Sequence, residues 1–210
     1  MIKKNLKVLI ITSIVILLPI LAGLLLWNKL PQQLPFHWNA QGQVDGWASK
    51  YMAVFGMPGI LLALQWLCAL ATGADPKKQS HSDKILHLVL WIIPVLNLFL
   101  SVLTYTAALG TNVRMELVMP IFMGLLFTVI GNYLPKCKQN YTIGIKIVWT
   151  LHSEENWNRT HRFAGKLWVI CGIAMMLTGF LGSIWVFFGI SLVMIISTFL
   201  YSFILYKKGI

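Results

Sequence analysis

Long apolar segments dominate this chain and limit the folds that are open to it. A helix that spans a membrane needs about 20 mostly apolar residues, because each residue rises about 1.5 Å across a hydrocarbon core of about 30 Å. Six segments meet this requirement, at residues 8–28, 52–72, 85–109, 114–134, 165–181 and 184–206. We therefore predict an all-α integral membrane protein, in which residues 1–210 form a single membrane domain built as a bundle of about six transmembrane helices.

The composition argues against an ordinary soluble fold. Only 11% of the residues are charged and 58% are hydrophobic, whereas soluble domains carry about 25% charged residues. The first apolar segment follows several lysines and in this respect looks like a signal peptide. It continues from Val8 to Trp27, which is long for the apolar region of a secretory signal. We therefore predict that it is the first transmembrane helix.

The basic residues predict how the helices are oriented. The chain has 17 Lys and Arg residues and a formal net charge of +11. If the N-terminus is cytoplasmic, only Lys29, Lys50 and Arg114 lie outside the cell, which follows the positive-inside rule for short loops. Basic residues between apolar segments also suit lipid head groups. We expect membrane lipids as partners, no direct contact with nucleic acid, and both termini in the cytoplasm.

The first long connection, an extracellular loop at residues 28–51, combines aromatic residues with turn-forming ones. The run from Asn39 to Gly42 and the pair Asp45-Gly46 are typical of turns, so we expect a small hairpin-like loop. One hypothesis is a binding surface for an apolar or amphipathic peptide. Its candidate residues are His37, Trp38, Asn39, Asp45 and Lys50. The alternative, which the residues alone favour, is an aromatic belt at the membrane surface. A metal site at His37 and Asp45 would lack a third ligand.

The second long connection, a cytoplasmic loop at residues 135–164, shows signs of internal structure. The alternation of Ile143, Ile145 and Ile147 predicts an extended stretch. Ser153 is expected to cap a helix that has Glu154 and Glu155 in its first turn. This helix is predicted to continue into the fifth apolar segment.

Two histidines and two glutamates in this loop raise the alternative of a membrane-embedded enzyme that is metal-dependent or that modifies lipids or peptides. These residues are His152, Glu154, Glu155 and His161. Their spacing does not match the His-Glu-x-x-His helix of zinc enzymes, so we favour a helix whose glutamates pair with its own arginines. We predict no cofactor and no metal, with His161 and Glu155 as the remaining metal candidates. The question of enzymatic activity stays open, and a non-enzymatic role is favoured.

Each loop also contains a longer motif. The first comprises Leu34 to Asn39 and Gly42 to Gly46, and the second comprises Gly131 to Pro135, Asn140, Ile143-Gly144-Ile145, Trp149-Thr150-Leu151, Glu155, Trp157, Thr160-His161-Arg162 and Gly165-Lys166. Together they resemble the SdpI-like family of bacterial membrane immunity proteins. The chain departs from the family pattern at Lys146-Ile147-Val148, where the family usually has Arg-Thr-Pro. This change removes a bidentate donor and a rigid residue.

The resemblance implies a protein of the bacterial cell membrane that protects the cell from a secreted peptide toxin. It further implies signalling by a small transcriptional repressor held at the membrane. The first-loop candidates would contact the toxin, and the second loop would transmit its presence or hold the repressor. The second-loop candidates are Asn132, Asn140, Gly144, Lys146, Trp149, Thr150, Glu155, Trp157, Thr160, His161 and Arg162. A toxin-exporting transporter is a further alternative, although the chain shows no nucleotide-binding loop and no coupling carboxylate.

Overall fold

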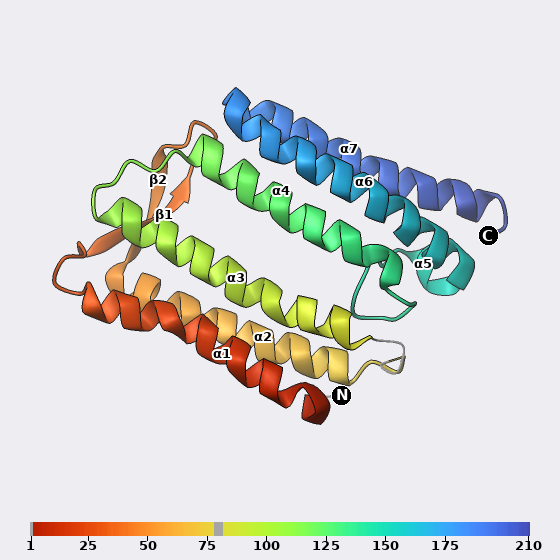
Figure 1. Cartoon of the computed structure of the whole chain (residues 1–210), viewed down its shortest axis with the longest axis horizontal. Coiled ribbons are helices and arrows are strands. Elements are labelled where there is room, and N and C mark those ends of the chain that lie inside the picture. Colours follow the sequence, from red (N-terminus) through yellow and green to blue (C-terminus); the bar gives the residue numbers. More distant parts are fainter. Residues whose placement is uncertain (1, 78–81) are drawn as a thin grey trace. The chain divides into compact units, whose positions relative to one another are not determined.

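The structure is a computed structural model that describes residues 2–77 and 82–210. Its elements, labelled in Figure 1, are α1 (Ile2–Leu25), β1 (Gln33–Trp38), β2 (Val44–Ser49), the π-helical turn η1 (Met52–Gly56), α2 (Met57–Gly73), α3 (Asp83–Ala108), α4 (Met115–Tyr133), the 3₁₀ turn η3 (Leu134–Lys136), α5 (Val148–His152), α6 (Glu154–Leu181) and α7 (Ile184–Lys207). Within the described residues, 6 helices are long and apolar enough to cross a membrane. The predicted fold class, an all-α multi-pass membrane protein, is confirmed.

Large apolar side chains remain exposed along the spanning helices, as expected where a helix faces lipid. Leu67 on α2 is 63% exposed, Phe180 on α6 is 73% exposed, and Trp185 on α7 is 73% exposed. Such extensive apolar exposure is unusual for a soluble monomer. It suits contact with the hydrocarbon of a bilayer.

The chain divides into two compact units. The first comprises Met1–Ala74 and Leu86–Arg114, and the second comprises Asp75–Ile85 and Met115–Ile210. The first unit contains the loop at residues 28–51, and the second contains the loop at residues 135–164. The prediction of a single membrane domain stays a prediction.

In the first unit, α1, α2 and α3 lie side by side (Figure 1), and polar side chains connect them. The side-chain amide of Asn97 on α3 donates to the carbonyl oxygen of Ile16 on α1 at 2.8 Å. The Tyr105 hydroxyl on α3 donates to the carbonyl oxygen of Pro19 at 3.1 Å. Both bonds reach α1 near its internal proline, which lacks the N–H that a helix needs for its backbone ladder. Such buried hydrogen bonds hold membrane helices together.

In the second unit, α4 and α6 approach closely along a line of glycines. Gly165, Gly172 and Gly179 of α6 lie against Gly131, Gly124 and Leu117 of α4, in that order. A Cβ atom added to Gly124 would lie 2.4 Å from the Gly172 carbonyl oxygen, so no larger residue fits without moving a backbone. Small residues at regular spacing allow membrane helices to pack with their backbones in contact.

The fifth span begins earlier than the predicted segment 165–181, because α6 starts at Glu154. The predicted cap is confirmed, since the Ser153 side chain accepts a hydrogen bond from the Asn156 backbone N–H at 3.1 Å. The prediction of an extended stretch around Ile143 and Ile145 is wrong for residues 141–144. They form bends, because Gly144 has a φ angle of +120° and turns the chain.

Candidate functional site: two motif-bearing loops

The loop at residues 28–51, the hairpin loop, contains an antiparallel pair of strands. The register of β1 and β2 places His37 opposite Gly46, and a Cβ on that glycine would lie 2.8 Å from the histidine Cβ. His37 Nδ1 lies 2.5 Å from Asp45 Oδ1, and the two side chains are 70% and 43% exposed. The hairpin therefore presents a paired imidazole and carboxylate at the surface.

Two other candidates of the hairpin loop stabilise it from within. Lys50 is only 6% exposed. Its ammonium group donates to the Trp27 carbonyl oxygen at 3.0 Å and lies 4.9 Å from the centre of the Trp27 ring. Asn39 Oδ1 accepts from the backbone N–H groups of Gln41 and Gln43, each at 3.0 Å. Lys50 thus ties the hairpin to the chain just beyond α1, and Asn39 shapes its turn.

The aromatic residues of this region divide into an exposed set and a packed one. Phe36, Trp47 and Tyr51 are 45%, 57% and 66% exposed. Trp38 is half-buried and lines a cavity of about 80 Å³ together with Tyr105 of α3. The exposed aromatics and the His37–Asp45 pair thus belong to the same short region of the chain.

The loop at residues 135–164, the signature segment, is organised around Asn140, which is 1% exposed. Its amide nitrogen donates to the carbonyl oxygens of Lys138 and Ile143, each at 2.8 Å. Its amide oxygen accepts from the backbone N–H groups of Thr142 and Ile143 at 2.8 and 2.6 Å. One side chain thus satisfies four backbone groups that no helix or strand would pair.

Three further candidates pack against this turn. The Trp157 ring is fully buried and donates from Nε1 to the Cys137 carbonyl oxygen at 2.7 Å. It stacks on the His161 ring with centroids 4.1 Å apart. Gly144 lies against both rings, because an added Cβ would be 2.6 Å from His161 Nε2 and 2.9 Å from the Trp157 ring. The turn therefore requires glycine for its backbone angle and for space.

Both nitrogens of His161 are used within the protein. Nδ1 donates to the Trp157 carbonyl oxygen at 2.8 Å, and Nε2 accepts from the Ile145 backbone N–H at 3.0 Å. An imidazole that accepts at one nitrogen and donates at the other is neutral. His161 is 1% exposed, whereas the Glu155 side chain is 59% exposed and pairs with Arg159. In the structure, His161 therefore bonds to the backbone and Glu155 to an arginine.

Thr150 and Trp149 position α5. The Thr150 hydroxyl lies within hydrogen-bond distance of the Ile145 and Ile147 carbonyl oxygens, at 2.9 and 2.8 Å. It also accepts from the Ile147 backbone N–H at 3.1 Å. The Trp149 ring packs among three aromatic residues of α7. These are Phe199, Phe203 and Tyr206, with centroids 5.2, 5.5 and 5.7 Å away.

Two buried residues that tie the segment to its surroundings were not predicted. Asn156 donates to the carbonyl oxygens of Ser202 and Ile210, each at 3.1 Å, and accepts from the Thr160 hydroxyl at 3.0 Å. Asp75 accepts from the Tyr141 backbone N–H at 2.9 Å. Asn156 and Thr160 are four residues apart on a helix, which places them on one face and is a signal that the sequence offered.

The remaining candidates lie at the surface of the signature segment or beside it. Asn132, Lys146, Glu155 and Arg162 are exposed. Lys146 donates to the Thr142 carbonyl oxygen at 3.1 Å, and Glu155 pairs with Arg159 at 2.5 Å, one helical turn away. Exposed charges of this kind are free to exchange their partners.

The Cys137 thiol is buried within the signature segment. Its thiol lies 3.3 Å from the Ile143 carbonyl oxygen, and burial raises the pKa of the thiol to about 11, with the Asn140 hydrogen bond acting in the opposite direction. In residues 2–77 and 82–210, no three His, Cys, Asp or Glu side chains gather as metal ligands would. The signature segment is therefore a packed turn with a charged exterior.

Comparison with known proteins finds a family-model match over most or all of each loop. The SdpI/YfhL protein family matches residues 136–202, and a domain of unknown function (DUF1648) matches residues 14–62. The Immunity protein SdpI of Bacillus subtilis (strain 168) is 30% identical over 178 residues, which cover 85% of this chain and 82% of that relative. No solved structure gives a significant match. An identity of this size, sustained along most of both proteins, shows that the chain belongs to the SdpI/YfhL family.

Proposed function

We propose that this membrane protein confers immunity to a secreted antimicrobial peptide. The observation that carries the proposal is the 30% identity, over 85% of the chain, to a protein whose name is Immunity protein SdpI. The family match at residues 136–202 agrees with it. A protein of this kind needs a surface that meets the peptide.

The hairpin loop is the proposed contact surface for the peptide. His37 and Asp45 are exposed and paired, and Phe36, Trp47 and Tyr51 offer exposed rings nearby in the chain. A membrane-active peptide combines apolar side chains with charges, so rings and a polar pair match its two kinds of surface. Trp38, Asn39 and Lys50 would support this surface from within the hairpin.

The proposal places the hairpin loop outside the cell and both termini in the cytoplasm. Only Lys29, Lys50 and Arg114, of 17 basic residues, then lie outside, as the positive-inside rule favours. The signature segment would face the cytoplasm, where Lys146 and Arg162 are exposed for a partner. We propose that this face holds a small repressor protein while the peptide is bound outside.

The test is survival of a susceptible bacterium that expresses the chain during exposure to a panel of secreted antimicrobial peptides. Protection against at least one apolar or cationic peptide is expected. The variants His37→Ala and Asp45→Ala are expected to lose much of that protection, because they remove the exposed polar pair. Membrane insertion is measured in parallel by fractionation.

Gln41→Ala is the matched control, because Gln41 lies exposed in the same hairpin and uses its backbone N–H to bond Asn39. It should protect as well as the wild type does. Full protection by both His37→Ala and Asp45→Ala would remove the hairpin from the proposal. If the bacterium that expresses the unmutated chain stayed sensitive to every peptide tested, the immunity function itself would be contradicted.

A further inference from the structure

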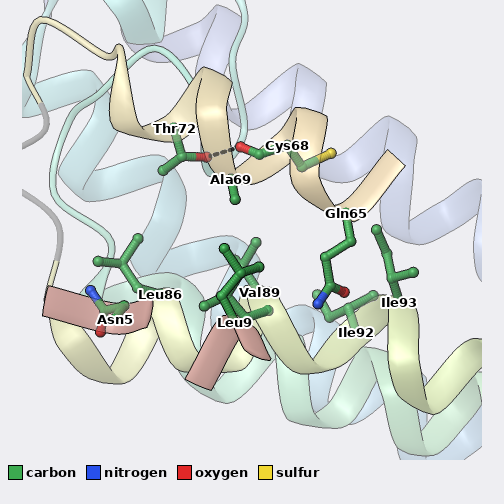
Figure 2. Close-up of a pocket in the computed structure, with 11 residues that line it drawn as sticks. Asn5, Leu9, Gln65, Cys68, Ala69, Thr72, Leu86, Val89, Ile92 and Ile93 are labelled. Carbon is green, nitrogen blue, oxygen red and sulfur yellow. Dashed lines mark hydrogen bonds between the residues drawn. The ribbon is translucent and has the colours of Figure 1, made fainter. Parts of the chain in front are cut away.

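The first unit contains two cavities with different linings. The larger, of about 220 Å³, lies between α1, α2 and α3 and is lined mostly by apolar side chains such as Leu9 and Val89 (Figure 2). That lining selects for no particular chemical group. The smaller, of about 80 Å³, is lined by residues of β1, η1, α2 and α3, and we call it the hairpin cavity. Its lining combines aromatic rings with polar groups.

Polar groups of α3 form one side of the hairpin cavity. Asn97, Ser101 and Thr104 line it, and their spacing of four and three residues places them on one face of the helix. Ser101 and Thr104 are half-buried. Polar groups within a spanning helix are candidates for a function.

The two hydroxyls of this face are not used by their own helix. In other spans, Thr72 and Thr128 each donate to the carbonyl oxygen four residues earlier, at 2.8 Å, and Figure 2 shows the bond of Thr72. Neither the Ser101 nor the Thr104 hydroxyl makes a hydrogen bond among the residues that the structure describes. Their oxygens therefore remain open to a donor inside the cavity.

Two further side chains of the lining direct their hydrogens away toward α1. Asn97 donates from its amide nitrogen to the Ile16 carbonyl oxygen at 2.8 Å. The Tyr105 hydroxyl donates to the Pro19 carbonyl oxygen at 3.1 Å. What remains of each group is chiefly an oxygen that can accept. The polar part of the lining therefore offers acceptors, and none of the lining residues is Lys, Arg, Asp or Glu.

Aromatic rings complete the lining. Phe36 and Trp38 of β1 and Tyr105 of α3 contribute to it, and Phe36 is 45% exposed, so the cavity borders the surface at the hairpin. The face of an aromatic ring attracts a cation, because its quadrupole is negative there. Rings and oxygen acceptors together favour a positively charged hydrogen-bond donor over an anion.

The hairpin loop already buries one ammonium group with partners of these two kinds. Lys50 is 6% exposed. Its ammonium group donates to the Trp27 carbonyl oxygen at 3.0 Å and lies 4.9 Å from the centre of the Trp27 ring. An ammonium group is therefore accommodated in this region by an uncharged oxygen and an indole ring, and the hairpin cavity offers both.

We propose that the hairpin cavity binds an aliphatic primary ammonium group, as a lysine side chain of the secreted peptide presents it. Its N–H groups would donate to the Ser101 and Thr104 oxygens, beside the ring of Trp38. At roughly 15 Å³ for one water-sized sphere, a volume of about 80 Å³ holds about five non-hydrogen atoms, which matches a four-carbon chain with its nitrogen. The peptide as the source of the ammonium rests on the proposed function, whereas the site itself does not.

The test is photolabelling of the purified full chain in nanodiscs of zwitterionic lipid. The probe is a butylamine with a diazirine at the carbon farthest from nitrogen, and the matched probe carries a hydroxyl in place of the ammonium. Mass spectrometry should place the amine label on peptides that contain β1 and residues 97–105. The amine should label about fivefold more than the alcohol, because hydrogen bonds from charged donors are roughly twice as strong as neutral ones.

Three variants separate the proposed contacts from the fold. The double variant Ser101→Ala, Thr104→Val removes both acceptors with little change in volume, so the two probes should label it equally. Trp38→Leu removes a ring and should lower labelling by the amine more than by the alcohol. Thr106→Val is the matched control on α3, because Thr106 does not line the cavity, and it should keep the fivefold preference. Unchanged labelling by the alcohol shows that a variant is folded.

Competition in the wild-type protein links the site to lysine without relying on any variant. N-acetyl-lysine methylamide should displace the amine label, whereas the same compound acetylated at its side-chain nitrogen is neutral and should not. Equal labelling of the wild type by the two probes would overturn the proposal, and would indicate that water occupies the cavity. Displacement by both lysine compounds alike would overturn it as well.

The outcome is distinguishable from that of the survival test, because labelling uses no toxin. Loss of the amine preference removes the site and leaves protection by the chain untouched. A preserved amine preference in a chain that protects against no peptide would retain the ammonium site and overturn the peptide as its source.

Discussion

The hairpin loop and the signature segment each contain a turn held by an asparagine side chain, but the two asparagines differ in burial. In each, an asparagine accepts hydrogen bonds from two backbone N–H groups that follow it in a turn, Asn39 from Gln41 and Gln43, and Asn140 from Thr142 and Ile143. Asn39 is half-buried, whereas Asn140 is 1% exposed. Water can replace the bonds of the first, and nothing can replace those of the second without unfolding the turn.

This difference indicates which motif residues are free to act on a partner. In the signature segment the motif side chains bond to the backbone or pack against one another. These residues are Asn140, Gly144, Thr150, Trp157 and His161. In the hairpin loop, the polar pair is at the surface. A family motif can therefore mark a buried, packed turn in one loop and an exposed polar pair in another.

The largest loss of stability is expected for Gly144→Ala. The alanine would have to adopt a φ of +120° and place its Cβ 2.6 Å from His161 Nε2. We expect a loss of about 3 kcal/mol or more in the free energy of unfolding, from backbone strain and the displaced rings. Denaturant titration of the purified protein in mixed micelles measures it.

Gly182→Ala is the matched control for that variant. Gly182 also has a positive φ, +62°, but an added Cβ meets nothing within 4 Å. Its free energy of unfolding should fall only by the cost of backbone strain, about 1 kcal/mol. If the two variants lost equal stability, the close packing of Gly144 against Trp157 and His161 would not be what requires a glycine there.

The next largest effect compares the two asparagines directly. Asn140→Ala leaves buried N–H and carbonyl groups without partners and should cost about 3 kcal/mol, since each orphaned group costs about 1–3 kcal/mol. Asn39→Ala should cost about 1 kcal/mol or less, because water reaches its turn. The same denaturant titration provides both values. Equal losses would mean that burial does not distinguish the two loops.

Local signals in the sequence predicted the spans and the start of α6. Apolar length identifies a transmembrane helix, and Ser153 before two glutamates is a capping signal that needs no tertiary information. The glycines at 165, 172 and 179 were not used in the prediction, although regular small residues could have indicated the close packing of α4 and α6.

Burial of the candidate residues could not be predicted in this way. The partner of Lys50 is the carbonyl of Trp27, 23 positions earlier in the chain, and His161 Nε2 bonds Ile145, 16 positions earlier. Such contacts join positions far apart in the chain, so the periodicity of a local sequence pattern does not predict them. Lys50 and His161 were therefore predicted as binding candidates, although in the structure their side chains bond within the protein.

A smaller effect is expected on the reactivity of Cys137. Only the thiolate reacts with alkylating reagents. Burial raises the pKa of this thiol from 9.0 to about 11, so its thiolate fraction near neutral pH falls about 100-fold. With Cys68 and Cys171 replaced by serine, alkylation of Cys137 should be at least that much slower in the folded protein than in SDS. It should speed up as the pH rises toward 11. Fast alkylation at neutral pH would show that the signature segment opens readily.

The smallest effect is expected at the surface of the signature segment, where Glu155 pairs with Arg159. The two side chains are 59% and 47% exposed and lie one helical turn apart, so the pair should contribute no more than about 0.5 kcal/mol to stability. A double-mutant cycle with Glu155→Ala and Arg159→Ala, measured in the same titration, gives the coupling directly. Because folding does not depend on this pair, the single variants also isolate function from stability. A variant that keeps its fold and still loses protection would indicate that Glu155 contacts a partner. A coupling several times larger would mean instead that the outer face of the segment is as much a part of its packing as Asn140 is.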